Sequence, residues 1–281
     1  MPGILYVVAT PIGNLADLSA RAIDVLRSVA VVACEDTRTS RTLLSQHGIA
    51  TRRFALHEHN ERAAGAQLIA ELRAGKDVAL ISDAGTPALS DPGALLVEAA
   101  HREGLRVVPV PGPSAALAAF SAAGFRSGRW LFAGFLPATR AARRKALEAI
   151  EEAAPVVFYE APHRVADTVA DLAVRFGPGR EVVIARELTK KFEEIARLPL
   201  GEAQGWLQAG PHRRQGEFVL VLGPGEARSG DALAEGTRVL AVLLDALPAS
   251  EAARLAARIS GAPRRDLYRI ALERKARAGS R

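Results

Sequence analysis

The sequence predicts an α/β protein with two α/β domains, a cleft between them, and a small all-helical unit at the C-terminal end. Three observations support this fold class. Short runs of apolar, β-favouring residues alternate with segments of helical periodicity along most of the 281 residues, which is typical of a mostly parallel sheet with helices on both faces. Loops rich in Gly, Pro, Ser and Asp follow several of the apolar runs. Beyond residue 230 the periodicity is helical throughout.

The first domain is predicted to span residues 1–111. Apolar runs favour strands at residues 5–9, 29–34, 78–81 and 106–110. Helical spacing favours helices at residues 20–28, 61–74 and 94–102. Ser19 and Asn60 are the expected N-caps of the first two helices, and Gly75 is the expected C′ residue of the second. The Pro-Val-Pro-Gly-Pro run at 109–113 is stiff, and we interpret it as the hinge that ends this domain.

The second α/β domain is predicted to span residues 112–225 and the C-terminal helical unit residues 231–281. Strands are expected at 130–135, 156–159, 182–185 and 217–222, and helices at 114–123, 140–152 and 164–176. Gly, Pro and Ser make the segment 223–230 a linker. Three further helices are expected at 232–246, 250–259 and 264–274, the last two joined by a Gly-containing turn. Such a pair is similar to a helix-turn-helix, with a small dimerising hairpin as the alternative.

Positive charge gathers at the C-terminal end of the chain. The net charge is +6, and residues 261–281 carry +5 of it. A basic segment of this kind favours a polyanionic partner, most simply nucleic acid, although a solvated helix end would have the same composition. The basic residues expected to contact RNA there are Arg264, Arg265 and Arg269.

Composition narrows the class of protein and its cofactors. Hydrophobic residues make up 49% and charged residues 24%, no apolar run is long enough to span a bilayer, and the N-terminus lacks a signal-peptide pattern. We therefore expect a soluble, cytoplasmic protein with no membrane partner. The single cysteine, Cys34, excludes an internal disulfide, and His57 and His59 lack a third ligand at metal-binding spacing, so no metal is expected. The glycine patterns of dinucleotide-binding and P-loop proteins are also missing.

Five turn-rich or polar loops follow predicted strands. They span residues 10–14, 35–40, 82–93, 111–115 and 159–164. Open α/β sheets bind their ligands at the carboxyl ends of strands, so these loops are expected to line one shared cleft. The segment 82–93 is the most informative of them, because its glycines allow close approach to the backbone and its prolines stiffen the loop.

The residues of these loops resemble the tetrapyrrole-methylase superfamily, and within it the ribosomal branch that methylates ribose 2′-hydroxyls of 16S rRNA. The first matching segments are Val7-Val8-Ala9-Thr10-Pro11-Ile12-Gly13-Asn14-Leu15, Cys34-Glu35-Asp36-Thr37-Arg38 and Ser82-Asp83-Ala84-Gly85-Thr86-Pro87. Segments at 111–115, 132–137, 159–164 and 185–191 extend the match over roughly residues 4–223. The porphyrinoid members carry Gly-Asp-Pro in the third loop. This chain has Asp83-Ala84-Gly85-Thr86-Pro87 instead, which favours the RNA branch.

The resemblance implies S-adenosylmethionine as cofactor, 16S rRNA of the small ribosomal subunit as partner, a cytidine of the decoding region as acceptor, and a homodimer. It implies that the methionine and ribose portions are bound by Pro11, Asp83, Ala84, Gly85, Thr86, Ser114, Ala115 and Phe132. The residues that it places nearer to the adenine are Tyr159, Arg186, Glu217 and Phe218. A tetrapyrrole methyltransferase and a non-catalytic RNA-binding protein remain as alternatives.

Methylation of a ribose hydroxyl needs a base to take up its proton. The catalytic candidates at the cleft are Asp36, Glu58, His59 and Glu160, with Glu35 and His57 beside them. The candidates for contact with RNA phosphates are Arg38, Arg164 and Lys190, and Arg186 is a further candidate. For each of these side chains, a salt bridge or a helix cap is the alternative role.

Overall fold

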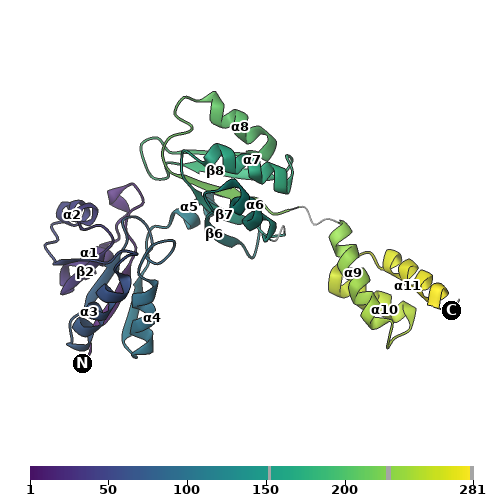
Figure 1. Ribbon diagram of the computed structural model, residues 1–281, viewed down its shortest axis with the longest axis horizontal. Helices are drawn as coiled ribbons and strands as arrows, with labels where there is room; N and C mark the ends of the chain where they lie inside the picture. The colour runs from purple at the N-terminus through teal and green to yellow at the C-terminus, as the bar shows by residue number, and fades with distance from the viewer. Residues whose placement is uncertain (151–152, 226–228, 279–281) are drawn as a thin grey trace. The chain divides into compact units, whose positions relative to one another are not determined.

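The computed structural model describes residues 1–150, 153–225 and 229–278, and it divides the chain into two compact units, Met1–Pro224 and Gly225–Arg281 (Figure 1). The first unit contains two sheets with their helices, and the second contains helices. The predicted fold class is thereby confirmed. No helix in the described ranges is both long and apolar enough to cross a membrane.

The first sheet is parallel, with strand order β3-β2-β4-β1-β5. Its strands are β1 (Ile4–Val8), β2 (Val31–Cys34), β3 (Arg53–Ala55), β4 (Val78–Ile81) and β5 (Arg106–Val110). Its helices are η1 (Leu15–Asp17), α1 (Ala20–Ser28), α2 (Thr37–Gln46), α3 (Glu61–Arg73) and α4 (Ala94–Arg102). Every residue of β2 and β4 is buried, because apolar clusters cover both faces of the sheet. Continuous apolar runs were therefore the right pattern for these strands.

Local details of the first domain differ from the sequence prediction. Helix α2 and strand β3 were not predicted, because α2 is mostly polar and β3 has three residues. Ser19 caps α1 as expected, accepting a hydrogen bond from the backbone N–H of Ala22 at 3.1 Å. Asn60 is the N-cap residue of α3 as expected, but its side chain makes no capping hydrogen bond. Its side chain instead accepts from the N–H of His57 at 2.8 Å, which fixes the loop that follows β3.

The second sheet is mixed, with strand order β6-β7-β10-β8-β9. Its strands are β6 (Leu131–Phe135), β7 (Val156–Glu160), β8 (Glu181–Arg186), β9 (Glu194–Pro199) and β10 (Phe218–Leu222). Strands β6 and β7 pair in parallel, whereas β10 pairs antiparallel with β7 and β8, and β8 pairs antiparallel with β9. The expected mostly parallel sheet is therefore wrong here. The reason is the short β8–β9 connection, which allows a hairpin but no crossover.

Helices pack on the second sheet through two apolar clusters. They are α5 (Ala115–Ala123), α6 (Arg140–Glu148), α7 (Val165–Phe176) and α8 (Leu200–Ala209). Helix α8 and strand β9 were not predicted. Residues 151–152, where the predicted helix 140–152 ends, lie outside the described residues. Helix α5 follows directly on the segment interpreted as a hinge, and its Ala116 and Ala119 pack against Val157 of β7 in one apolar cluster. The segment 111–114 thus leads the chain from one sheet to the other.

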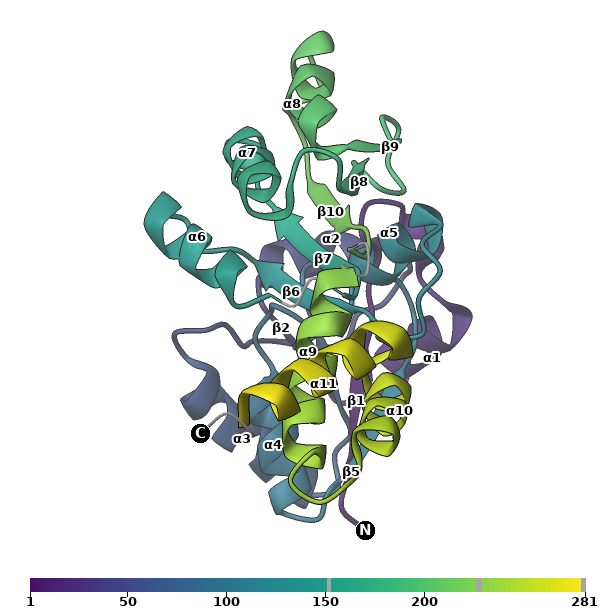
Figure 2. The same cartoon turned by 90° about the vertical axis from the view of Figure 1, so that its right-hand side faces the viewer.

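The C-terminal unit consists of α9 (Ser229–Leu243), α10 (Ala249–Ser260) and α11 (Arg264–Ala278), which pack on one another (Figure 2). The pair α10–α11 matches the predicted helix-turn-helix, with Gly261 in the left-handed region at φ +73°. Leu267 and Ala271 are buried in the core of this unit. The exposed residues of α11 include Arg264, Arg265 and Arg269. The side chains of Lys275 and Arg277, and all of Arg281, lie outside the described part of the chain.

We expect Gly236→Ala to destabilise the C-terminal unit. A Cβ at position 236 of α9 would lie 2.7 Å from Ser260 Oγ and 2.9 Å from Leu267 Cδ2, and overpacking of this kind costs about 1–3 kcal/mol. The change should speed amide hydrogen exchange across α9, α10 and α11. The matched control is Gly205→Ala in α8, where a Cβ meets nothing within 4 Å. Alanine there should slow exchange, since it favours a helix over glycine by up to about 1 kcal/mol. Equal effects of the two changes would contradict this packing.

Candidate functional site

The loops that follow the parallel strands of the first sheet lie at one edge and are bonded to one another. Thr10 and Gly85 exchange two backbone hydrogen bonds, at 2.8 and 3.0 Å, which join the loops after β1 and β4. The Thr86 hydroxyl donates to the carbonyl of Pro113 at 3.1 Å, which adds the loop after β5. The backbone N–H of Asp36 donates to Asp83 Oδ1 at 3.1 Å, which adds the loop after β2. The sheet edge is therefore one connected structure.

The loop after β4 has an unusual backbone. Gly85 has φ +81°, and the non-glycine residues Ala88 and Ser90 have φ +66° and +69°. Left-handed conformations of non-glycine residues are strained, and such strain gathers at ligand sites and switch regions. Ser90 also lies close to the second sheet, since a Cβ at Gly134 would be 3.1 Å from its Oγ.

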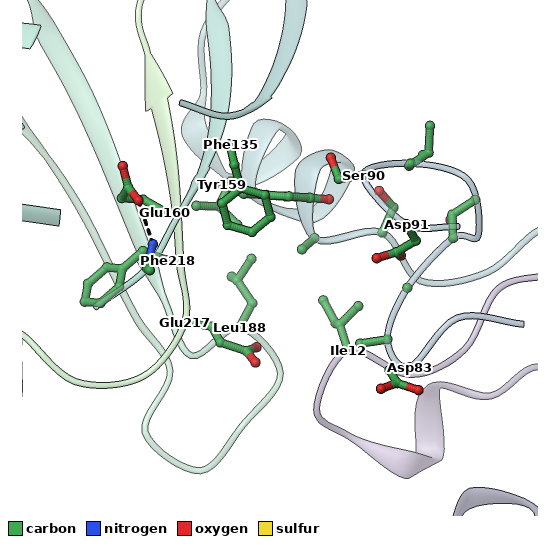
Figure 3. A pocket seen from close by; sticks show the side chains of 18 of the residues that line it. Ile12, Asp83, Ser90, Asp91, Phe135, Tyr159, Glu160, Leu188, Glu217 and Phe218 are labelled. Carbon is green, nitrogen blue, oxygen red and sulfur yellow. Dashed lines mark hydrogen bonds between the residues drawn. The ribbon is translucent and has the colours of Figure 1, made fainter. Parts of the chain in front are cut away.

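A cavity of about 390 Å³ opens between this edge and the second sheet (Figure 3). That volume is in the range of cofactor sites. Its first wall consists of Ile12, Asp83, Ala84, Gly85, Thr86, Leu89, Ser90, Asp91, Ser114 and Ala115. Its second wall consists of Phe135, Tyr159, Glu160, Ala161, Pro162, Leu188, Glu217, Phe218 and Val219.

Aromatic rings stiffen the second wall. Tyr159 meets Phe132 and Phe135 edge to face, with ring centroids 5.0 and 5.5 Å apart. Burial raises the pKa of the Tyr159 hydroxyl, although its hydrogen bonds at the start of α5, to Ala116 and Ser114, work in the opposite direction. The hydroxyl thus stays protonated at neutral pH.

The first wall is acidic. Burial, together with the charge of Asp83, raises the pKa of Asp91, and a hydrogen bond from Ser82 only partly offsets this. Glu35 follows β2 outside the wall itself, and its pKa is also raised by burial and by the charges of Asp83, Asp91 and Asp36. Carboxylates that raise one another's pKa favour a cation among them. The cavity therefore suits a ligand that has an apolar body and a positive charge.

The structure brings nine of the expected cofactor-binding residues to this cavity. They are Asp83, Ala84, Gly85, Thr86, Ser114, Ala115, Tyr159, Glu217 and Phe218. Pro11, Phe132 and Arg186 do not line it. Pro11 is buried and precedes Ile12 in the chain, and the ring of Phe132 contacts that of Tyr159 edge to face. The Arg186 guanidinium donates to the carbonyls of Gln215 and Phe192, at 2.7 and 2.9 Å, so it holds two loops together.

Sequence reasoning missed several residues of the walls. Leu89, Ser90 and Asp91 lie inside the segment 82–93 that the sequence analysis identified as the most informative loop. The charge and the turn residues of this segment were the signal that could have found them. Phe135, at the end of a predicted strand, is 56% exposed although it is a large aromatic residue. Val219 belongs to an apolar run, and nothing in the sequence distinguishes it from other core residues. Leu188 stands between Glu187 and Thr189, inside the segment 185–191 that carries the resemblance.

The expected catalytic residues occupy different environments. Glu160 lines the cavity but is 2% exposed. Its carboxylate accepts hydrogen bonds from the N–H of Ala161 and the hydroxyl of Thr168, and it pairs with Arg164 at 3.1 Å. Asp36 caps α2 and pairs with Arg38 at 2.8 Å. These contacts lower the pKa of Asp36 to about 2.

Glu58 and His59 lie in the loop after β3, at the same sheet edge as the cavity wall but outside the wall itself. Both side chains are exposed, and the His59 ring lies 6.0 Å from that of His57. Among the residues that the structure describes, no three His, Cys, Asp or Glu side chains come together as a metal site requires.

The residues expected to bind RNA near the cavity differ in how exposed their side chains are and in how many protein groups they already contact. Arg38 is 90% exposed. Arg164 donates to the carbonyls of Leu136 and Pro137. Lys190 lies between Glu187 and Glu217, with Nζ 3.0 Å from each carboxylate. Of these three described side chains, Arg38 is thus the most accessible to a phosphate.

We expect Asp91→Asn to raise the thermal midpoint of unfolding at neutral pH. Because the pKa of Asp91 is raised in the folded state, its ionisation costs the folded state free energy at pH 7, and this cost vanishes below the ordinary carboxyl pKa of about 4. The gain in thermal midpoint should therefore be present at pH 7 and lost as the pH falls to 4. Each kcal/mol added to the free energy of unfolding raises the midpoint by about 2–4 °C. Calorimetric scans over this pH range measure it. The control is Asp17→Asn, at an exposed position. A gain at position 91 that does not depend on pH would contradict the raised pKa of Asp91.

Comparisons with known proteins agree with this architecture. The family profile described as Tetrapyrrole (Corrin/Porphyrin) Methylases matches residues 4–204, and the profile described as RsmI C-terminal HTH domain matches residues 230–275. The chain is 51% identical to the ribosomal RNA small subunit methyltransferase I of Pseudomonas aeruginosa, over 98% of this chain and 99% of that protein. It is 48% identical to the protein of that name from Escherichia coli O157:H7, over 97% and 96%.

Solved structures show the same fold at low identity. A uroporphyrin-III C-methyltransferase from Thermus thermophilus aligns with a TM-score of 0.55 at 21% identity, covering 79% of this chain and 94% of that one. The cobalt precorrin-4 methyltransferase CbiF aligns with a TM-score of 0.57 at 16% identity, covering 78% and 94%.

Proposed function

Because this chain belongs to the tetrapyrrole (corrin/porphyrin) methylase family and is closely related to the ribosomal RNA small subunit methyltransferases I, we propose that it methylates small-subunit rRNA with S-adenosylmethionine. We propose further that the acceptor is the ribose 2′-hydroxyl of a cytidine in the decoding region. The observation that carries the proposal is the combination of the cavity at the sheet edge with a helical, basic C-terminal unit in one chain.

The residues of the cavity fit the proposed cofactor. Backbone groups of the loop at 84–86 and the start of α5 would hold its polar ends, and the aromatic wall around Tyr159 would hold its adenine. S-adenosylmethionine, when bound, supplies an electrophilic methyl group on a positively charged sulfur. The carboxylates of Asp83 and Asp91 suit a positively charged ligand, because they line the cavity and their mutual repulsion would be relieved by it.

The chain contributes mainly by positioning. An in-line displacement is accelerated when donor and acceptor are held in the reactive geometry. The hydrogen bonds among Thr10, Gly85, Thr86 and Pro113 join the loops of the first wall and restrict their movement. The edge-to-face contacts of Tyr159 do the same for the second wall.

The proton of the ribose hydroxyl needs an acceptor. We propose Glu58 and His59 for this role, since both are exposed at the sheet edge and can reach an RNA substrate. Asp36 is a weak base because its pKa is about 2. Glu160 is engaged by Thr168, Arg164 and a backbone N–H, so we propose it as a positioning residue for the loop at 160–164.

The remaining features are proposed on the same basis. We propose domains at 1–111, 112–225 and 231–281, supported by the two sheets and by the separate compact unit at the C-terminus. We also propose a homodimer and a cytoplasmic location, in keeping with a ribosomal substrate. Arg38, and Arg264, Arg265 and Arg269 of α11, are exposed and are proposed as phosphate contacts.

The deciding experiment offers three acceptors to the full-length protein with methyl-labelled S-adenosylmethionine. They are small ribosomal subunits from cells lacking this methylation, free 16S rRNA and a tetrapyrrole. We expect label in the RNA, recovered as 2′-O-methylcytidine by mass spectrometry of nucleosides. Label in the tetrapyrrole would support that alternative instead, and binding of RNA without transfer would support a non-catalytic binding protein.

We expect the double change Glu58→Gln/His59→Asn to slow methyl transfer to small ribosomal subunits by about 10²–10⁴-fold, the usual contribution of a general base. Calorimetry should find the affinity for S-adenosylmethionine unchanged, since neither side chain lines the cavity. The matched control is Glu98→Gln/His101→Asn on α4, which should transfer methyl groups normally. A double variant as active as the wild type would remove both residues from the mechanism.

We expect deletion of residues 231–281 to weaken binding of small ribosomal subunits while binding of S-adenosylmethionine survives, because the C-terminal unit is compact by itself. The salt dependence of binding should become shallower, by about 0.7–0.9 in the log–log slope for each phosphate that the protein no longer neutralises. Filter binding at several salt concentrations measures this slope. An unchanged slope would show that the C-terminal unit binds no phosphates.

A further inference from the structure

The starts of α6 and α7 lie at the border of the cavity. Strand β6 ends at Phe135 and strand β7 at Glu160, and both residues line the cavity. Helix α6 begins five residues after the first of these, at Arg140, and α7 follows Arg164. The N-terminal ends of both helices are therefore within five residues, along the chain, of residues that line the cavity.

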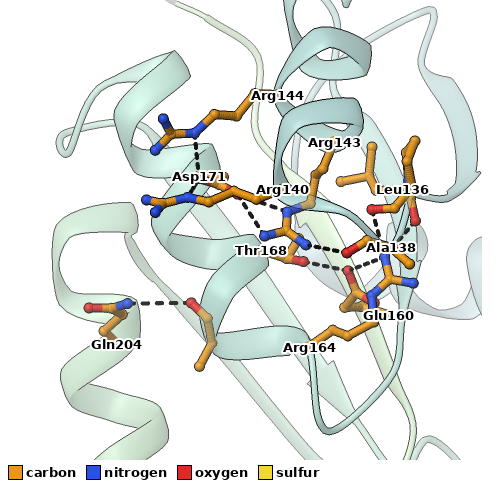
Figure 4. A network of polar contacts seen from close by, with 12 residues as sticks. Leu136, Ala138, Arg140, Arg143, Arg144, Glu160, Arg164, Thr168, Asp171 and Gln204 are labelled. Carbon is orange, nitrogen blue, oxygen red and sulfur yellow. Dashed lines mark hydrogen bonds and ion pairs between the residues drawn. The ribbon is translucent and has the colours of Figure 1, made fainter.

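A buried carboxylate gathers three arginines of α6 (Figure 4). The Asp171 side chain, on α7, is 1% exposed. Arg143, 3% exposed, binds its Oδ2 through Nη2 at 2.7 Å and Nε at 2.8 Å. This one guanidinium is enough to neutralise and satisfy that oxygen. The Arg143–Asp171 pair therefore joins α6 to α7, together with the apolar cluster that Leu147 and Leu172 share.

Two more arginines reach the same carboxylate from the surface. Arg144 Nε lies 2.9 Å and Arg140 Nε 3.3 Å from Asp171 Oδ1, and their side chains are 44% and 68% exposed. Both contacts use Nε. Among the residues that the structure describes, the terminal amino groups of Arg140 and Arg144 have no protein acceptor. Those groups remain available to an anion.

The cluster formed by Asp171, Arg140, Arg143 and Arg144 carries excess positive charge. Although burial works against it, hydrogen bonds from Arg144, Arg143 and Arg140 hold the pKa of Asp171 below its usual range, so it is ionised at neutral pH. Three guanidiniums against one carboxylate leave two uncompensated positive charges. Lys145 adds a third on the same helix, while Glu148 and Asp167 are the exposed carboxylates on α6 and α7. Neither has an ion pair within the described ranges.

Attachment to Asp171 also prepares the two outer arginines for binding. A free arginine loses about 2 kcal/mol of side-chain entropy when it is fixed. Here a buried acceptor already restricts both side chains through Nε, which leaves their planar amino edges toward solvent. Positions 140 and 144 are one helical turn apart, with Cβ atoms about 6 Å from each other. A guanidinium presented in this way binds phosphate oxygens through two parallel hydrogen bonds.

We propose that Arg140 and Arg144 form a phosphate-binding surface that holds the RNA backbone beside the cavity. This inference rests on the proposed function, because it takes rRNA as the acceptor. The surface belongs to the catalytic unit and is separate from the C-terminal unit. It supplies affinity and register near the reacting nucleotide without reading its base.

The test is the double variant Arg140→Gln/Arg144→Gln, which keeps Arg143 and Asp171 and therefore the packing of α6 on α7. We expect its Kd for unmethylated small ribosomal subunits to rise about tenfold at 0.1 M salt. The log–log salt slope should become shallower by about 1.5, the value expected when two phosphates are no longer neutralised. Binding of S-adenosylmethionine should stay within about twofold of the wild type.

Two control variants make the result specific. Arg73→Gln/Arg102→Gln removes two exposed arginines at the ends of α3 and α4, at the opposite edge of the first sheet. It should bind subunits like the wild type. Arg140→Lys/Arg144→Lys keeps the charge and should retain most of the salt slope. An unchanged slope in the Gln variant, or an equal effect in the Arg73/Arg102 control, would overturn the proposal.

Methyl transfer by the wild-type protein is measured in the same samples. A wild type that binds the subunits but transfers no methyl group contradicts the proposed function, and the salt slopes still decide about Arg140 and Arg144. A wild type that does not bind the subunits contradicts both.

Discussion

The backbone pair between Thr10 and Gly85 is the constraint on which the rest of the site depends. It joins the loops after two neighbouring parallel strands. The Thr10 hydroxyl, fully buried, adds a bond to the carbonyl of Ser82 at 3.1 Å. Glycine is required at position 85, where φ is +81°. With this pair in place, Thr86 reaches Pro113 and Asp83 reaches Asp36, so one contact sets the position of four loops.

The second sheet completes the site because its central strand, β10, runs antiparallel to both of its neighbours. Strand β10 lies between β7 and β8, and its first residue, Phe218, pairs with Glu160 at the end of β7. This register brings Glu217 and Val219 to the cavity beside Tyr159. A wholly parallel sheet would have placed the start of β10 at the opposite edge. The mixed topology is thus a condition for the second wall.

The sequence predicted the parts of the fold that depend on local pattern. Continuous apolar runs located β2 and β4, and turn residues located the loops at 10–14, 82–93 and 111–115 that the structure joins. It did not reveal β9, an edge strand that carries charges, or α2, whose periodicity is polar. Nor could it show that Arg186 and Arg164 bind backbone carbonyls, because their partners Gln215 and Leu136 lie 29 and 28 residues away. The pairing of such residues is set by the tertiary fold alone.

A crystal structure of the protein with S-adenosylhomocysteine tests most directly whether this cavity is the cofactor site. We expect the ligand between the loop at 84–86 and Tyr159, with its amino group near the carboxylates of the first wall. The loops of the first sheet should show the hydrogen bonds that join Thr10 to Gly85 and Thr86 to Pro113. Density for the ligand anywhere else, or a first wall rebuilt around it, would contradict a preformed cofactor site at this sheet edge.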